Sequence, residues 1–387
     1  MHAADVGDDG SVSGRSSSQE LRFVTARDGT RIAYARQGRG TPLVRAAHWL
    51  SHLELDWQSP VWRPFLTELA RDRALIRYDE RGTGLSDRDV VDLSFEAMVG
   101  DLETLVDALG LERFPLLGMS QGGAMAIAYA ARHPERVTGL VLCGAYARGH
   151  GHPDRGPDQQ READLLLDLI RVGWGTPDPK FRRVFASMFV PDATPEILEG
   201  FDQLQRVSAS AQTAYRLRQM FGSIDVTGDL ASIAVPTLVM HVRGDGVVPF
   251  DEGRLLAASI PGARFVPLEG RGHVLVHGTA AFAGFFAELD AFLGSEPVRR
   301  RAAPEMYAGA GTESGLLAGR LAALTLRERE VLDLVAAGRT NDQIATTLFL
   351  SPRTVERHLS NSYLKLGIEG KSARAAAAAI VSRSEPR

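Results

Sequence analysis

Short apolar runs alternate with amphipathic stretches through the first 293 residues. Helical patterns separate most of the runs, which predicts an α/β fold with a mainly parallel, doubly wound sheet covered on both faces. Ahead of these runs, two alternating strands flank Asp28-Gly29 and predict a hairpin. The runs with the length and composition of buried strands are LVRAA (43–47), LIRYD (75–79), FPLLG (114–118), VTGLVLCG (137–144), PTLVMHV (236–242) and ARFVPLEG (263–270).

One connection departs from this alternation. Between about residues 147 and 229 the sequence has no strand signal, and stretches such as EADLLLDLIRVGW have the pattern of amphipathic helices. A long helical insertion between two core strands predicts a lid over the carboxyl edge of the sheet, where α/β proteins bind ligands. The large apolar side chains of this segment favour an apolar ligand, although most of them are expected to form the lid's own core. They are Trp174, Phe185, Met188, Phe189, Tyr215, Met220 and Phe221.

The rest of the chain divides by composition. Residues 1–18 are rich in Gly, Ser and Asp and are predicted to be a disordered tail, whereas residues 294–315 are rich in Gly, Pro, Ala and Arg without periodicity and are predicted to be a linker. Residues 19–293 then form one α/β domain, and residues 316–387 form a small all-α domain.

Composition narrows the class of protein. With 44% hydrophobic and 24% charged residues, the chain is globular and is neither mainly disordered nor fibrous. Cys143 is the single cysteine, which excludes a disulfide framework and a thiolate metal cluster and fits a reducing compartment. We find neither a signal-peptide pattern at the start nor an apolar run of the ~18 residues that cross a bilayer. We therefore expect a cytoplasmic protein that needs no membrane, metal or cofactor.

Charge is distributed unevenly along the chain. From Ala318 to Arg387 there are 11 Lys and Arg against 7 Asp and Glu, whereas the remainder has 33 against 41. An acidic body with a basic C-terminal segment places any contact with nucleic acid in that segment.

A nucleophile candidate lies at the end of the third buried run. Gly118-Met119-Ser120-Gln121-Gly122 has the pattern G-x-S-x-G and is followed by AMAIAYAARHP, a helix of small residues. A serine on a tight strand-to-helix turn needs neighbours without bulk, which the flanking glycines provide. The alternative is a plain glycine-rich turn with a buried serine.

An acid and a histidine follow in the chain order that such a serine needs. Asp245 comes just after the run at 236–242, and His273 comes just after the run at 263–270. Both positions bring side chains to the sheet edge that holds Ser120, so His273 would take the serine proton and Asp245 would orient the imidazole. Taken singly, Asp245 could be a turn-forming aspartate and His273 a loop histidine.

These features resemble the α/β-hydrolase family over about residues 21–293, with YDERGTGLSD (78–87) similar to the family's turn after its fourth strand. The resemblance implies that Asp79, Arg81, Gly82, Gly84 and Ser86 hold that turn without catalysing. It also implies an oxyanion site with backbone donors at Trp49 and Gln121, beside His48 and Met119. Where the family has His-Gly, this chain has Ala47-His48, a departure that is expected to slow turnover. Trp49 and His48 could equally be pocket walls, and Trp57 and Trp62 are expected in the core.

The C-terminal segment divides into capped helices. Thr325 with Glu328, and Thr340 with Gln343, form capping boxes at two helix starts, and Gly338 ends the first helix. Ser351 and Pro352 begin a third helix, predicted over 352–366. Two such helices joined by a tight turn at Phe349-Leu350 form a helix-turn-helix.

This segment is similar to the LuxR-type (FixJ/NarL-like) DNA-binding domain over about residues 321–383, because it contains LTLREREVLDLVAAG, TNDQIA and LSPRTVERHL. The alternative is a small helical oligomerisation domain. The resemblance implies that the helix at 352–366 enters the major groove of double-stranded DNA. Glu356, Arg357 and Ser360 are expected at base edges, and Arg353, Thr354, Asn361 and Lys365 at phosphates. Val355, Leu359 and Leu366 are expected to pack inward, and His358 is ambiguous.

The helix predicted over 371–383 would pair two copies, since family members dimerise through this element, so we expect a homodimer. Two hypotheses for function then remain. In the first, the protein is a transcriptional regulator whose hydrolase-fold domain binds, and can hydrolyse, a small apolar ester- or lactone-like signal. In the second, it is a serine esterase or lactonase with an appended DNA-targeting module. The sequence identifies neither the ligand nor the operator.

Overall fold

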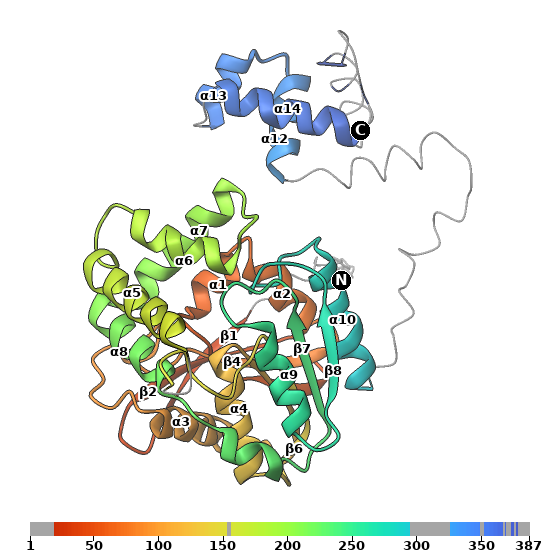
Figure 1. The fold of residues 1–387 in the computed structure, drawn as a ribbon. Coiled ribbons are helices and arrows are strands. Elements are labelled where there is room, and N and C mark those ends of the chain that lie inside the picture. Colours follow the sequence, from red (N-terminus) through yellow and green to blue (C-terminus); the bar gives the residue numbers. More distant parts are fainter. Residues whose placement is uncertain are drawn as a thin grey trace, which may run out of the picture. The chain divides into compact units, whose positions relative to one another are not determined.

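The computed structural model describes residues 19–152, 156–294, 326–348, 352–366, 368, 373–374 and 377. The chain forms two compact units, Met1–Pro297 and Val298–Arg387. Each unit is described by itself (Figure 1). The predicted tail at residues 1–18 and most of the predicted linker at 294–315 lie outside the described residues. No described helix is long and apolar enough to cross a membrane.

The first unit is built on one eight-stranded sheet with the order β1-β2-β4-β3-β5-β6-β7-β8. The strands β1 and β2 form the predicted antiparallel hairpin, and β2 also pairs antiparallel with β4. The five remaining pairings, which join β4, β3, β5, β6, β7 and β8 in that order, are parallel. The mainly parallel sheet is therefore confirmed. The strands are β1 (Glu20–Thr25), β2 (Arg31–Gln37), β3 (Thr41–Arg45), β4 (Arg73–Tyr78), β5 (Phe114–Met119), β6 (Val137–Cys143), β7 (Thr237–Val242) and β8 (Arg264–Leu268).

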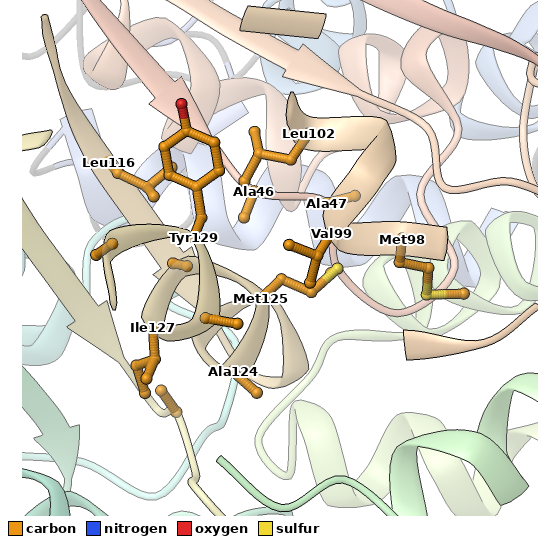
Figure 2. Close-up of a cluster of buried hydrophobic side chains, with 14 of the residues drawn as sticks. Ala46, Ala47, Met98, Val99, Leu102, Leu116, Ala124, Met125, Ile127 and Tyr129 are labelled. Atoms are coloured by element: carbon orange, nitrogen blue, oxygen red, sulfur yellow. The ribbon is translucent and has the colours of Figure 1, made fainter. Parts of the chain in front are cut away.

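Helices cover both faces of the sheet, because successive residues of a buried strand point to opposite sides. Leu116 of β5 packs in one buried cluster with α3 (Phe95–Ala108), α4 (Gln121–Arg132) and α9 (Phe250–Ser259), part of which Figure 2 shows. Its neighbour Leu117 packs on the other face. On that face Leu117 packs with α2 (Trp62–Leu69) and α10 (Ala280–Phe292). A short helix, α1 (Leu53–Gln58), precedes α2.

The segment between β6 and β7 is helical, as predicted. Its helices are α5 (Pro157–Gly173), α6 (Lys180–Phe189), α7 (Pro195–Ser208), α8 (Ala211–Gly222) and the 3-10 helix η1 (Thr227–Ser232). We call α5 to α8 the lid. The side chains of Thr194 and Ser210 cap α7 and α8 by accepting backbone N–H groups of their first turns. Trp174 and Phe185 lie in the lid's own apolar cluster, as expected for most of its large side chains.

The second unit contains α12 (Leu326–Ala336), α13 (Asn341–Leu348) and α14 (Pro352–Leu366). The predicted capping box is present, since Thr340 Oγ1 accepts from the Gln343 N–H at 3.3 Å and Gln343 Oε1 accepts from the Thr340 N–H at 3.0 Å. Val355 and Leu359 are buried in the small core, as predicted. Thr325, Phe349-Leu350, Ser351 and most of the helix predicted over 371–383 lie outside the described residues, as does the side chain of Leu366.

Candidate active site

Ser120 occupies a strained turn between β5 and α4. Its backbone has φ 52° and ψ −131°, which L-residues rarely adopt. The flanking glycines explain how the turn fits: a Cβ on Gly122 would lie 2.4 Å from the carbonyl oxygen of Ala47, and one on Gly118 would lie 2.6 Å from the Cα of Gly123. The G-x-S-x-G spacing is therefore a packing requirement, and it brings the serine to the carboxyl end of β5.

Asp245 and His273 meet at the same edge of the sheet. Asp245 follows β7 and His273 follows β8, and Asp245 Oδ2 lies 2.7 Å from His273 Nδ1. The other carboxylate oxygen accepts the backbone N–H groups of Val247 and Val248, at 2.8 and 3.0 Å. Burial alone would raise the pKa of Asp245, but the charge and hydrogen bond of His273 and the Val248 N–H hold that pKa below its ordinary value. Asp245 is thus an ionised, oriented partner for the imidazole.

A cavity of about 120 Å³ contains Ser120 and Asp245 in its wall. Ser120 Oγ makes no hydrogen bond to His273, although both residues are described; such bonds are often long in ligand-free enzymes. Phe189 of the lid packs against the His273 ring at 5.4 Å between centroids. The wall comprises Trp49, Ser120, Gln121, Tyr146, His150, Gln159, Glu162, Ala163, Leu166, Phe185, Met188, Phe189, Arg218, Phe221, Asp245, Gly246, Val247 and Pro249.

The structure places the expected oxyanion residues in two groups. Trp49 and Gln121 line the cavity, and the Gln121 N–H is in the first turn of α4, where backbone donors have no acceptor within the helix. His48 and Met119 are buried outside the cavity wall. His48 instead lies 4.8 Å from the Trp62 ring, and its Nδ1 lies 3.1 Å from the Trp49 carbonyl oxygen.

The loop that carries Trp49 has its own strained residue. Leu50 has φ 52°, and among the described residues Leu50 and Ser120 are the two non-glycine residues with positive φ. Burial, and next the charge of Arg45, hold the pKa of His48 well below its ordinary value, so this imidazole is neutral. His48 is therefore a neutral, buried side chain of this loop that contacts the Trp49 carbonyl and the Trp62 ring.

The turn at residues 78–87 acts structurally, as the resemblance implies. The Asp79 carboxylate accepts from Ser51 Oγ at 2.7 Å and from the backbone N–H groups of Leu53 and Leu85. Arg81 donates to the buried carboxylate of Asp101. These buried, paired groups fix the end of β4.

Sequence reasoning missed two residues near Ser120. Glu80 is 1% exposed, and its Oε1 accepts from Gln121 Nε2 at 3.2 Å; burial raises its pKa to about 8. Arg218, on α8 of the lid, lines the cavity. Glu80 lies in the turn at residues 78–87, which the sequence identifies. Arg218 lies in no recognisable motif, so nothing in the sequence singles it out. The described residues contain no group of three or more His, Cys, Asp and Glu that could hold a metal ion.

In the second unit, α14 presents two of the expected base-reading residues to solvent. Glu356 and Ser360 are exposed, and Ser360 Oγ donates to the Glu356 carbonyl at 3.0 Å. The side chains of Arg353, Thr354, Arg357, Asn361 and Lys365 lie outside those that the structure describes. His358 is half-buried, and its carbonyl accepts from the buried Ser362.

Comparison with known proteins gives two family matches. The sequence model described as "alpha/beta hydrolase fold" matches residues 54–278, and the one described as "Bacterial regulatory proteins, luxR family" matches residues 322–378. The AB hydrolase superfamily protein YisY of Bacillus subtilis is 30% identical over 61% of this chain and 86% of its own. The non-heme chloroperoxidase CPO-A1 of Kitasatospora aureofaciens is 31% identical over 65% of this chain and 92% of its own. Among solved structures, an esterase from Exiguobacterium antarcticum has a TM-score of 0.61 at 27% identity, covering 70% of this chain and 98% of that one.

Proposed function

The chain belongs to the alpha/beta hydrolase fold family and carries a LuxR-type DNA-binding domain, and on this basis we propose that it is a transcriptional regulator whose hydrolase domain binds and hydrolyses a small ester- or lactone-like signal. The observation that carries the proposal is a cavity lined by the strained Ser120 and by Asp245, whose carboxylate pairs with His273. Because a DNA-binding domain lies on the same chain, such a ligand can act as a signal that regulates transcription.

The chemistry assigns one role to each residue. Ser120 Oγ attacks the ligand's carbonyl carbon while His273 Nε2 takes its proton, and Asp245 stabilises the imidazolium that forms. The backbone N–H groups of Gln121 and Trp49 stabilise the oxyanion. The protonated His273 then gives its proton to the leaving alcohol, and a water molecule hydrolyses the acyl-serine by the same steps. The similar esterase supports an ester as the substrate.

The DNA-binding half uses α14. Glu356, Arg357 and Ser360 are proposed to contact bases, and Arg353, Thr354, Asn361 and Lys365 to contact phosphates, in a homodimer that reads two half-sites. Arg357→Ala is expected to weaken specific binding by about 1–3 kcal/mol and relax one base position, whereas Lys365→Ala weakens binding to all sequences alike. Fluorescence anisotropy with matched and mutated operators separates these outcomes.

A fluorophosphonate probe tests the hydrolase half. The full-length protein is expected to bind one probe at Ser120, and Ser120→Ala and His273→Ala are expected to abolish labelling; peptide mass spectrometry identifies the modified residue. Absence of labelling in folded protein would contradict hydrolysis and leave a non-catalytic receptor. The second candidate, a tethered hydrolase, is favoured by the same catalytic residues and predicts that occupancy of Ser120 leaves DNA binding unchanged.

A further inference from the structure

The lid contains several arginines, and their partners differ sharply. Arg182 is fully buried and donates to Asp202 and to the carbonyl oxygen of Trp174, at 2.6 and 2.7 Å. Arg216 donates to backbone carbonyls of the loop after β4. Arg171 stacks on the Tyr215 ring and donates to its hydroxyl at 2.7 Å. Each of these guanidinium groups has a defined structural task.

Arg218 has no such partner. Its side chain lines the cavity that contains Ser120, yet within the described part of the chain it donates no hydrogen bond and forms no ion pair. Burial lowers its pKa, against the opposing effects of Tyr146 and Glu162, but a guanidinium stays protonated in proteins. A partly buried cation with unsatisfied donors costs free energy, which a bound anion would recover.

The acids in the cavity wall do not neutralise Arg218. Asp245 is engaged by His273 and by two backbone N–H groups. Glu162, on α5, also lines the cavity, but it is exposed and lies beyond ion-pair distance of Arg218. The lid also contributes apolar side chains to the wall, among them Leu166, Phe185 and Phe221.

We infer that Arg218 binds a carboxylate on the ligand, at the end away from the carbonyl that Ser120 attacks. This inference rests on the proposed function and narrows its ligand from an apolar ester to an anionic one with an apolar middle. The planar guanidinium matches a carboxylate in two parallel hydrogen bonds, and apolar side chains contact the hydrocarbon between the two ends. The cavity of about 120 Å³ is slightly smaller than the ~150 Å³ that holds a benzene-sized molecule, so that hydrocarbon is short.

Two esters that differ in one terminal group test the inference. Mono-4-nitrophenyl glutarate ends in a carboxylate, and 4-nitrophenyl pentanoate ends in a methyl group. For each protein, the ratio of kcat/KM for the anionic ester to that for the neutral ester is measured with full-length enzyme. Arg218→Met is expected to lower this ratio by about 10- to 100-fold, because a hydrogen-bonded charge is lost. A ratio that stays within about twofold of wild type would overturn the inference.

Arg171→Met is the matched control, because Arg171 is on the lid but outside the cavity wall. It removes the same positive charge from the lid, so a general effect of net charge would lower both ratios equally. The inference predicts that the ratio for Arg171→Met equals that of wild type.

A binding measurement separates this inference from the hydrolysis on which it rests. In Ser120→Ala protein, the monomethyl ester of glutarate and the neutral amide of its free carboxylate are titrated calorimetrically, with and without the additional change Arg218→Met. Tighter binding of the acid than of the amide, lost about tenfold or more with Arg218→Met, supports the inference even if no ester is hydrolysed. Equal affinities in both proteins would overturn it, even if Ser120 reacts with the fluorophosphonate.

Discussion

Two turns border the cavity, and each contains one residue with φ 52° that is not glycine. In the nucleophile turn, the strained residue is Ser120, and glycines stand on both sides where a Cβ would collide with backbone. In the loop after β3, the strained residue is Leu50, and the stretch Ala46-Ala47-His48-Trp49 has no glycine at all. The sequence pattern therefore predicts the strained conformation of the first turn but not that of the second.

The difference lies in what holds each conformation. Gly118 and Gly122 remove the steric obstacle, so a local pattern is sufficient to recognise the turn. Leu50 is 2% exposed and packs in the lid's apolar cluster, and the neutral, buried His48 packs against the Trp62 ring. Tertiary packing therefore stabilises strain that glycine would otherwise relieve. The family's His-Gly pattern is therefore sufficient to locate this loop in the sequence, but it does not predict the positive φ at Leu50.

The largest effect is expected from Gly122→Ala, which presses the nucleophile turn against the loop. The new Cβ would lie 2.4 Å from the Ala47 carbonyl oxygen, and backbone must move to accommodate it. We expect a loss of about 3 kcal/mol in the free energy of unfolding, measured by chemical denaturation, together with loss of fluorophosphonate labelling.

Gly100→Ala is the control for this change. A Cβ on Gly100, within α3, meets nothing within 4 Å, so alanine there is expected to stabilise the helix by about 0.5–1 kcal/mol. If Gly122→Ala is as stable as wild type, the two turns do not constrain each other as described.

A smaller effect is expected from Glu80→Gln, beside the nucleophile turn. The folded protein holds the Glu80 proton up to about pH 8, whereas the unfolded chain releases it near the ordinary pKa of about 4.5. Between these values the folded state binds more protons, so stability falls as pH rises and reaches a plateau above pH 8. Glutamine does not titrate, so the variant lacks this contribution to the pH dependence. We expect its free energy of unfolding at pH 9 to exceed that of wild type by on the order of 2 kcal/mol.

Thermal or urea unfolding at several pH values between 4.5 and 9 measures this difference. Glu112→Gln serves as the control, because Glu112 is exposed and its replacement should leave the pH dependence of stability unchanged. Parallel pH profiles for wild type and Glu80→Gln would show that Glu80 is ionised in the folded protein.

The smallest effect concerns Leu50 itself. Leu50→Ala and Leu50→Gly both lose the buried side chain, but only alanine keeps the strain of a positive φ. We expect the glycine variant to be at least as stable as the alanine variant, with a difference of about 1 kcal/mol or less. At Leu66, which is buried in the interior of α2, the order should reverse, with glycine about 1 kcal/mol less stable than alanine. The same order at both positions would contradict strain at Leu50.

Much of the fold followed from local patterns. Each strand of the sheet overlaps a run or hairpin predicted from the sequence, because burial on both faces imposes continuous apolar segments. The strands β3 and β4 each begin two residues before the predicted run. The Thr340–Gln343 box and the bounds of α14 followed from capping residues, which act within one helical turn. Ser120, Asp245 and His273 follow the carboxyl ends of strands, and their order along the chain is enough to relate them to one another.

The rest depended on contacts that no local pattern specifies. His48 was expected beside the ligand, but packing against Trp62 turns it away from the cavity. In the sequence, Arg218 cannot be distinguished from the other arginines on the lid's amphipathic helices. Only the folded structure shows that it lines the cavity. Glu80 follows a structural aspartate directly, and only burial distinguishes it from an ordinary surface acid.

The central claim is that the state of the Ser120 cavity changes DNA binding. An operator is first selected from a random DNA pool with the full-length protein, and its Kd is then measured before and after reaction with a fluorophosphonate. Ser120→Ala protein receives the same treatment as the control for reaction elsewhere. We predict that modification of Ser120 changes the Kd for the operator by about 5- to 150-fold and that the Kd of the Ser120→Ala control stays unchanged. An identical Kd and an identical oligomeric state before and after modification would contradict a ligand-sensing regulator and favour the tethered hydrolase.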